Sequence, residues 1–131
     1  MTETALQELL DCTQQLLDSI AARDWEGYLR LCDPSLSAFE PEARGRLVEG
    51  MEFHRFYFDL ESEEIPVQTT IAMPHVRLLG SGDAAIVSYT RLIQTLSADG
   101  KPTTHCFEET RVWEQQDGQW RHVHFHRSSN P

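Results

Sequence analysis

The chain has 131 residues, a length that fits one folded domain, residues 1–131, with a hydrophobic core of its own. Its 21 acidic and 11 basic side chains give a formal net charge of −10, which repels a phosphate backbone, so we expect no nucleic-acid partner. No apolar run approaches the roughly 20 residues that cross a bilayer, and the N-terminus lacks the basic start of a signal peptide. We therefore expect a cytoplasmic protein that has no contact with a membrane.

The first half of the chain predicts three amphipathic helices. Leucines recur at three- and four-residue steps over residues 4–22, which indicates a helix with one apolar face. Asp24 is placed to cap a short second helix, and an Asp-Pro pair ends it because proline disfavours helical geometry in the residue before it. A strand is expected at residues 36–39. A third helix is expected over residues 49–60, with His54 on its otherwise apolar side.

The second half of the chain predicts four strands. From residue 65 the hydrophobic period becomes two, and glycine-containing turns separate the runs 65–79, 84–97, 102–115 and 119–127. Pro74 is expected to bend the first strand, because proline donates no hydrogen bond to a ladder. These elements predict an α+β fold in which N-terminal helices pack in the concave face of a curved antiparallel sheet and enclose a central pocket.

Three arginines on the predicted strands, Arg91, Arg111 and Arg127, share a face with large apolar residues. A guanidinium stays charged and is costly to bury alone, so the three require carboxylates or a bound anion. Three interpretations remain open: a pocket for an anion, ion pairs with carboxylates of the chain itself, or placement of the charged tips in solvent. The candidate internal carboxylates are Glu40, Glu108 and Glu109.

Other polar residues are expected beside the same pocket. His54 is either a core histidine bonded to backbone or part of the pocket lining. If the domain is an enzyme, an arginine could stabilise an enolate and one of four side chains would be the base. These four are His54, Tyr57, Tyr89 and Glu40. The sequence contains no phosphate-binding loop, dinucleotide fingerprint or nucleophile elbow, so we expect no cofactor.

Three histidines, His122, His124 and His126, alternate along the last predicted strand and are expected on one of its faces. Such an array could hold a metal ion. The sequence identifies no carboxylate as a fourth ligand, so we interpret the array as a polar strand face or a subunit contact and expect no metal site.

Longer runs of sequence carry a family resemblance. They are AFEPEA at 38–43, LVEGM at 47–51, FHRFYF at 53–58, EETRVW at 108–113 and HVHFHRS at 122–128. Taken in order, these runs span most of the chain and resemble the association (hub) domain of calcium/calmodulin-dependent protein kinase II. The resemblance implies the cone-shaped, cystatin-like fold of the nuclear transport factor 2-like (SnoaL-like) superfamily.

The resemblance also implies function. In the kinases this domain assembles into closed two-layered rings, commonly of twelve or fourteen subunits, and closed symmetry of that kind requires two types of interface. Its pocket binds small carboxylates such as γ-hydroxybutyrate analogues. By motif, the pocket residues correspond to Glu40, His54, Arg91, Arg111 and Arg127.

Two features depart from the family pattern. The chain begins with Met1 close to the first helix, so we expect neither kinase activity nor calmodulin binding. The loop at 61–64 is shorter and more acidic than in the family and lacks a tryptophan that folds over the pocket in one kinase isoform. The ligand preference of the family is therefore not carried over.

Three functions follow from these observations. The first is an assembly module without catalysis, whose partners are further copies of itself and kinase hub subunits. The second is a small pocket enzyme, an isomerase or dehydratase working by acid–base chemistry. The third is a carboxylate-sensing protein, in which occupancy of the pocket by a small carboxylate changes the stability of the ring.

Overall fold

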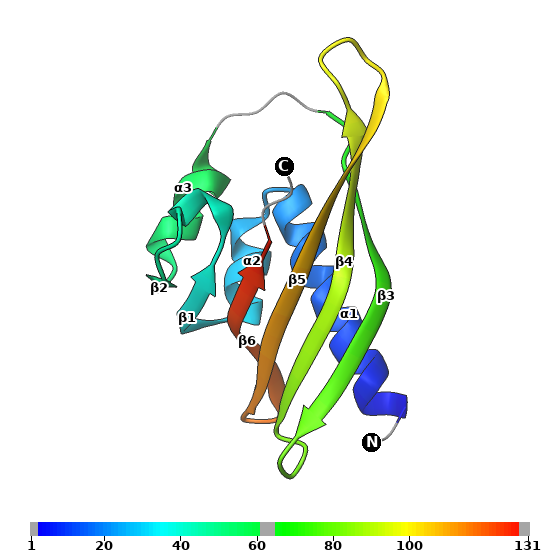
Figure 1. The fold of residues 1–131 in the computed structure, drawn as a ribbon. Helices are drawn as coiled ribbons and strands as arrows, with labels where there is room; N and C mark the ends of the chain where they lie inside the picture. Colours follow the sequence, from blue (N-terminus) through cyan, green and yellow to red (C-terminus); the bar gives the residue numbers. More distant parts are fainter. Residues whose placement is uncertain (1–2, 61–64, 129–131) are drawn as a thin grey trace.

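The structure is a computed structural model that describes residues 3–60 and 65–128, so the acidic loop at 61–64 lies outside the described residues. Within them, three helices pack beside one six-stranded sheet, as Figure 1 shows. The helices are α1 (Glu3–Ala21), α2 (Trp25–Leu31) and α3 (Glu52–Asp59), with a 3-10 turn η1 (Pro41–Ala43). The strands are β1 (Cys32–Phe39), β2 (Val48–Glu49), β3 (Gln68–Leu79), β4 (Ala84–Leu96), β5 (Pro102–Gln116) and β6 (Gln119–Arg127).

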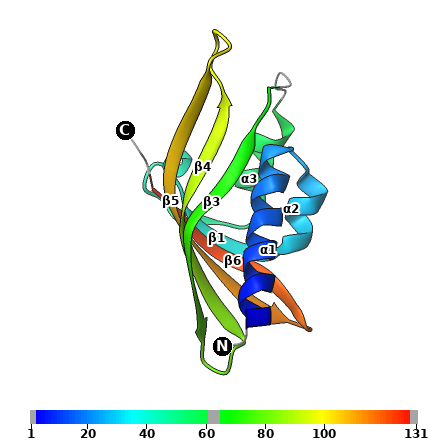
Figure 2. The same ribbon diagram turned by 90° about the vertical axis from the view of Figure 1, so that its right-hand side faces the viewer.

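The sheet has the strand order β2-β1-β6-β5-β4-β3. It curves, and the helices lie along one of its sides (Figure 2). The predicted α+β class is confirmed. The sheet is mixed rather than wholly antiparallel, because β1 pairs with β6 in parallel while the other pairs are antiparallel. This pairing joins the two halves of the chain, and sequence periodicity carries no information about which strands become neighbours.

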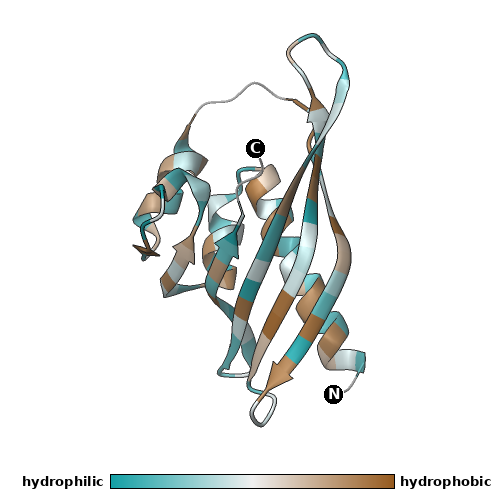
Figure 3. Ribbon diagram, viewed as in Figure 1, coloured by the Kyte–Doolittle hydropathy of each residue, from teal (hydrophilic) through white to brown (hydrophobic). Residues whose placement is uncertain are grey.

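The helices α1 and α2 supply one wall of the core. Leu9, Leu16 and Leu17 of α1 are fully buried, and burying each contributes about 2 kcal/mol of transfer free energy. Asp24 caps α2 as predicted, since its Oδ1 accepts a hydrogen bond from the Gly27 N–H at 3.0 Å. Along β4 and β5, inward and outward residues alternate in burial, and the corresponding bands of hydropathy are visible in Figure 3.

Pro74 bends β3 as predicted. The register between β3 and β4 shifts between Ala72 and His75, and Met73 adopts a positive φ of 51° there. The bend places Met73 in solvent, where it is 92% exposed. Because β3 is the edge strand of the sheet, the missing N–H of proline removes no hydrogen bond from a central ladder.

Three elements begin three or more residues from the predicted position, and one of them is β3, which begins at Gln68 instead of residue 65. The strand β1 begins at Cys32 instead of residue 36, and its pairing with β6 is irregular between Cys32 and Ser37, where the proline of the Asp-Pro pair lies. The helix α3 begins at Glu52 instead of residue 49, because Val48 pairs with β1 and Gly50 turns the chain with a φ of 85°. No helix among the described residues is long and apolar enough to cross a membrane.

Candidate functional site

A small cavity of about 120 Å³ lies between the helices and the inner face of the sheet. That volume equals roughly four water molecules. Six of the seven residues singled out from the sequence line it: Glu40, His54, Tyr57, Arg91, Arg111 and Arg127. The seventh, Tyr89, does not line this cavity, and its hydroxyl instead forms hydrogen bonds with Arg111 and Glu109. The apolar walls of the cavity come from Ile20, Tyr28, Phe58 and Phe125.

Glu109 of β5 is the carboxylate that forms ion pairs with two of the three arginines. Its Oε2 accepts a hydrogen bond from Arg91 Nη1, and its Oε1 accepts one from Arg111 Nη2, both at 3.0 Å. The Glu109 side chain is fully buried. Burial would raise the pKa of Glu109, but the guanidinium groups of Arg111 and Arg91 lower it to about 2. Internal ion pairing therefore explains Arg91 and Arg111, with Glu109 as the partner and neither Glu40 nor Glu108.

Arg111 is fixed by its surroundings on several sides. Its Nε donates to the Tyr89 hydroxyl at 2.8 Å, and its guanidinium lies over the Phe125 ring, 4.4 Å from the centroid. Its Nη1 lies 3.4 Å from His122 Nε2. Because an arginine only donates, His122 Nε2 must accept, which places the imidazole proton on Nδ1. Nδ1 lies 3.6 Å from Cys32 Sγ, so its proton faces the sulfur.

The three histidines of β6 do not share one face, and this part of the prediction is wrong. The register between β5 and β6 shifts so that Trp113 pairs with His122 while Val112 pairs with His124, and the extra residue is Val123. His122 consequently turns inward and is fully buried, and burial together with nearby Arg111 lowers its pKa. His124 instead bonds Ser37 of β1 at 2.7 Å.

Residues 3–60 and 65–128 contain no cluster of three or more His, Cys, Asp or Glu side chains arranged to hold an ion.

Glu40 and His54 form a second polar pair at the cavity, with Glu40 Oε1 at 3.4 Å from His54 Nδ1. Burial and the neighbouring Glu42 raise the pKa of Glu40 to about 7. Burial and Arg111 lower the pKa of His54 to about 4. Near neutral pH the histidine is therefore neutral and the carboxyl group is partly protonated.

Four buried polar atoms on the cavity lining find no hydrogen-bond partner within the described part of the chain. They are Glu40 Oε1, His54 Nε2, Arg91 Nε and Arg127 Nε. Buried polar atoms without partners are uncommon in folded proteins and cost free energy. Their convergence on one cavity favours occupation of that cavity by a polar ligand or water.

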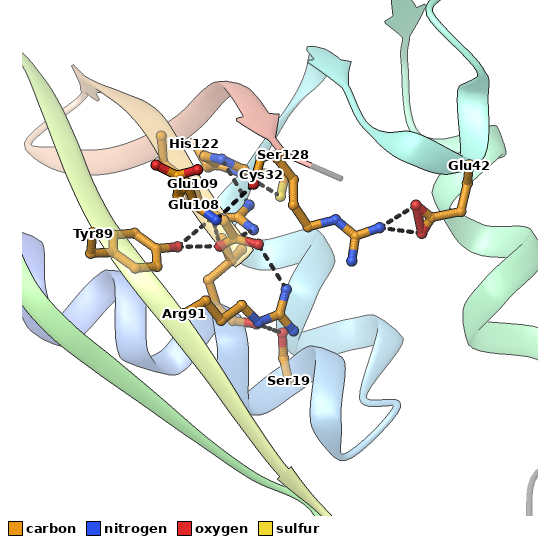
Figure 4. A network of polar contacts seen from close by, with 12 residues as sticks. Ser19, Cys32, Glu42, Tyr89, Arg91, Glu108, Glu109, His122 and Ser128 are labelled. Atoms are coloured by element: carbon orange, nitrogen blue, oxygen red, sulfur yellow. Dashed lines mark hydrogen bonds and ion pairs between the residues drawn. The ribbon is translucent and has the colours of Figure 1, made fainter. Parts of the chain in front are cut away.

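Arg127 has a different environment from the other two arginines. Its Nη2 forms an ion pair with both carboxylate oxygens of Glu42, on η1. Its guanidinium also lies over the Phe107 ring, 5.0 Å from the centroid. Figure 4 shows Glu42 on one side of the network and Tyr89 with Glu109 on the other. Sequence reasoning missed Glu42, because η1 has no hydrophobic period that would show where its side chains point.

The charged side chains around the cavity carry a net charge of +1 while Glu40 is protonated. Arg91, Arg111 and Arg127 carry three positive charges, and Glu109 and Glu42 carry two negative charges, so the count before Glu40 ionises is +1. The arrangement can therefore balance one small anion. The raised pKa of Glu40 also makes it a candidate proton acceptor in the same cavity.

Comparisons with known proteins agree on one family. A model of the calcium/calmodulin dependent protein kinase II association domain matches residues 5–131. The delta subunit of calcium/calmodulin-dependent protein kinase type II from Oryctolagus cuniculus is 52% identical over 127 residues, which are 95% of this chain but 24% of that kinase. The chain thus spans only a minor part of the length of this relative.

Solved structures extend the likeness to three dimensions. The hub homology domain from Chlamydomonas reinhardtii superposes with a TM-score of 0.92 at 49% identity, covering 97% of this chain and 99% of that one. A nuclear transport factor 2-like protein from Cytophaga hutchinsonii superposes with a TM-score of 0.74 at 21% identity, covering 99% and 100%. The second likeness shows that the fold is the cone predicted from the sequence.

Proposed function

Since this chain belongs to the calcium/calmodulin-dependent protein kinase II association domain family, we propose that it is a self-assembling module whose copies close into a ring. The family match over residues 5–131, at 52% identity to a kinase subunit, is the observation that carries the proposal. Twelve or fourteen copies are expected, by analogy with the family. Light scattering of the native particle across a dilution series tests this proposal.

Exposed apolar side chains support association. Phe56 on α3 is 61% exposed, and Leu60, the residue that follows the helix, is 45% exposed. Large apolar groups that stay in solvent in the isolated chain are typical of surfaces that other proteins cover. We propose that further copies of this chain cover these side chains. Kinase hub subunits in the cytoplasm are the second proposed partner, in mixed assemblies with this chain.

The cavity is proposed to bind one small carboxylate. The charge count of +1 with Glu40 protonated, the four buried polar atoms without a hydrogen bond in the described residues and a volume near 120 Å³ support an anion of a few heavy atoms. Propionate has this size, and propionamide has the same shape without the charge. We expect propionate, and not propionamide, to raise the melting temperature of the protein.

The variant for that test is Arg127→Gln. Arg111 is unsuitable, because removing it leaves Glu109 buried with one cation fewer and threatens the fold. Arg127 is partly exposed at 15% and is therefore replaceable. Loss of the propionate effect in Arg127→Gln supports the pocket, whereas an equal effect of propionamide contradicts it.

A second candidate function is acid–base catalysis on a bound carboxylate. Glu40 favours it, because a carboxyl group with a pKa of about 7 beside a neutral His54 suits proton transfer. Deuterium exchange into the methyl group of pyruvate in D2O, followed by NMR, is the test. Exchange that Glu40→Gln abolishes supports an enzyme, and exchange at the rate of the buffer alone contradicts one.

A further inference from the structure

The carboxylate partners of the three arginines differ in how easily they can leave. Glu109, the partner of Arg91 and Arg111, has a fully buried side chain and a third bond from Tyr89. Glu42, the partner of Arg127, has a side chain that is 35% exposed. Glu42 also lies on η1, a single 3-10 turn whose C-cap, Arg44, has a positive φ of 55°. Removing Glu42 from its arginine therefore requires no rearrangement of the core.

Glu42 occupies the side of Arg127 that an external carboxylate would need. Both residues line the same cavity, and both oxygens of Glu42 contact Arg127 Nη2. The Arg127 guanidinium also rests on the Phe107 ring, and its Nε is buried with no partner in the described ranges. Arg127 therefore keeps its position, with unused hydrogen-bonding capacity, when Glu42 moves away.

We propose that Glu42 is a built-in competitor for the ligand: an incoming small carboxylate binds Arg127 by displacing Glu42, and Glu42 thereby sets the affinity of the pocket. This inference rests on the proposed carboxylate binding and adds the residue that limits it. The competition is specific for charge, because a neutral amide cannot replace the two carboxylate oxygens that Arg127 loses.

Displacement also changes the electrostatics of the cavity. With Glu42 in place the three arginines face two ionised carboxylates, and without it they face Glu109 alone. With Glu40 protonated, the charge count rises from +1 to +2, which favours the entering anion. Glu42 is also one cause, after burial, of the raised pKa of Glu40, so its departure affects both carboxyl groups that line the cavity.

Glu42→Gln tests the inference, with propionate as the probe and calorimetric titration as the readout. The variant keeps the shape of the side chain and removes the charge that competes. We expect propionate to bind about threefold to tenfold more tightly than it binds the wild type, since a partly exposed ion pair no longer has to be broken. Propionamide binding should be the same in both proteins.

Glu49→Gln is the matched control. Glu49 is exposed on β2 and is not part of the cavity lining, so its replacement removes the same charge from the protein without freeing Arg127. A second readout needs no ligand: phenylglyoxal should modify Arg127 faster in Glu42→Gln than in Glu49→Gln or the wild type, as measured by peptide mass mapping.

The outcomes separate the inference from the proposed function. If propionate binds the wild type through Arg127 but Glu42→Gln binds it no more tightly than Glu49→Gln, Glu42 is no competitor while the carboxylate pocket stands. If only Glu42→Gln binds propionate, the inference holds in its strongest form. If none of the proteins binds propionate, both the pocket and the inference are wrong.

Discussion

Tyr89 and Glu109 occupy the same rung of the β4–β5 ladder, and the Tyr89 hydroxyl donates a hydrogen bond to Glu109 Oε1 at 2.5 Å. The same hydroxyl accepts from Arg111 Nε at 2.8 Å. Tyr89 thereby links the buried carboxylate to a buried guanidinium. Burial and Glu109 raise the pKa of Tyr89, although Arg111 lowers it, so the phenol stays protonated and keeps donating at neutral pH.

Glu109→Gln should destabilise the fold by about 3–5 kcal/mol, because it leaves two buried arginines without their shared counter-ion. Urea unfolding followed by circular dichroism measures the change. Glu108→Gln, at the preceding and exposed position of β5, is the control and should alter stability by less than about 0.5 kcal/mol. Equal stabilities of the two variants would show that the Glu109 network does not stabilise the fold.

The stability of the protein should depend on pH through Glu40. Its pKa is about 7 in the folded protein against 4.5 ordinarily, so folding favours its protonated form. The resulting stabilisation is complete below about pH 4.5, is lost as the pH rises through about 7, and amounts to at most about 3 kcal/mol. His54 acts oppositely: with a folded pKa of about 4 against 6.5, its contribution is present above pH 6.5 and is lost as the pH falls through 4.

Glu40→Gln isolates the first of these effects, because glutamine keeps a neutral side chain of the same shape at every pH. Between about pH 4.5 and pH 8 the variant should gain stability relative to the wild type, with the difference largest at the alkaline end. Urea unfolding at several pH values measures the difference. A difference that stays constant over this range would mean that Glu40 ionises as an ordinary carboxyl group.

His122 should be neutral, with its proton on Nδ1, because Nε2 faces the donor-only Arg111. Burial and Arg111 lower its pKa, so this tautomer should persist as the pH falls through about 6.5, where an ordinary histidine takes up a proton. The ¹⁵N chemical shifts of the ring distinguish the two tautomers and the protonated form. Protonation of Nε2 at neutral pH would require a different arrangement of Arg111.

Replacing Phe56 by Asp should weaken self-association. The change places a charge on the exposed apolar side of α3, and burying that charge in an interface without a partner costs about 2 kcal/mol or more. Ser81→Asp, in the exposed β3–β4 turn, introduces the same charge away from α3. Sedimentation velocity should show smaller particles for Phe56→Asp than for Ser81→Asp; identical profiles would exclude this side of α3 from the interface.

The sequence predicted those features that depend on local periodicity. The leucine spacing located α1, the period of two located β3 to β6, and strand alternation placed Arg91 and Arg111 together on the inner face. Glu109 had been one of three candidate partners. Alternation along β5 places Glu109 on the face of Arg111 and Glu108 on the opposite face. Choosing Glu109 over Glu40 required the register of β4 against β5, which aligns Glu109 with Tyr89.

Features that depend on long-range pairing or on irregular backbone were missed. The parallel pairing of β1 with β6 joins residues about ninety positions apart, and nothing in either strand specifies its neighbour. The bulge at Val123 turns the His122 side chain to the inner face of the sheet, and no glycine or proline in the sequence indicates a bulge there. Glu42 projects from a single 3-10 turn, for which no periodic pattern exists.

The central claim is that copies of this chain assemble into a closed ring, and the mass of the native particle tests it most directly. Light scattering behind a sizing column should give ten or more copies of the 15.1 kDa chain, and the mass should remain constant on dilution. A particle with the mass of a monomer or a dimer would contradict the claim.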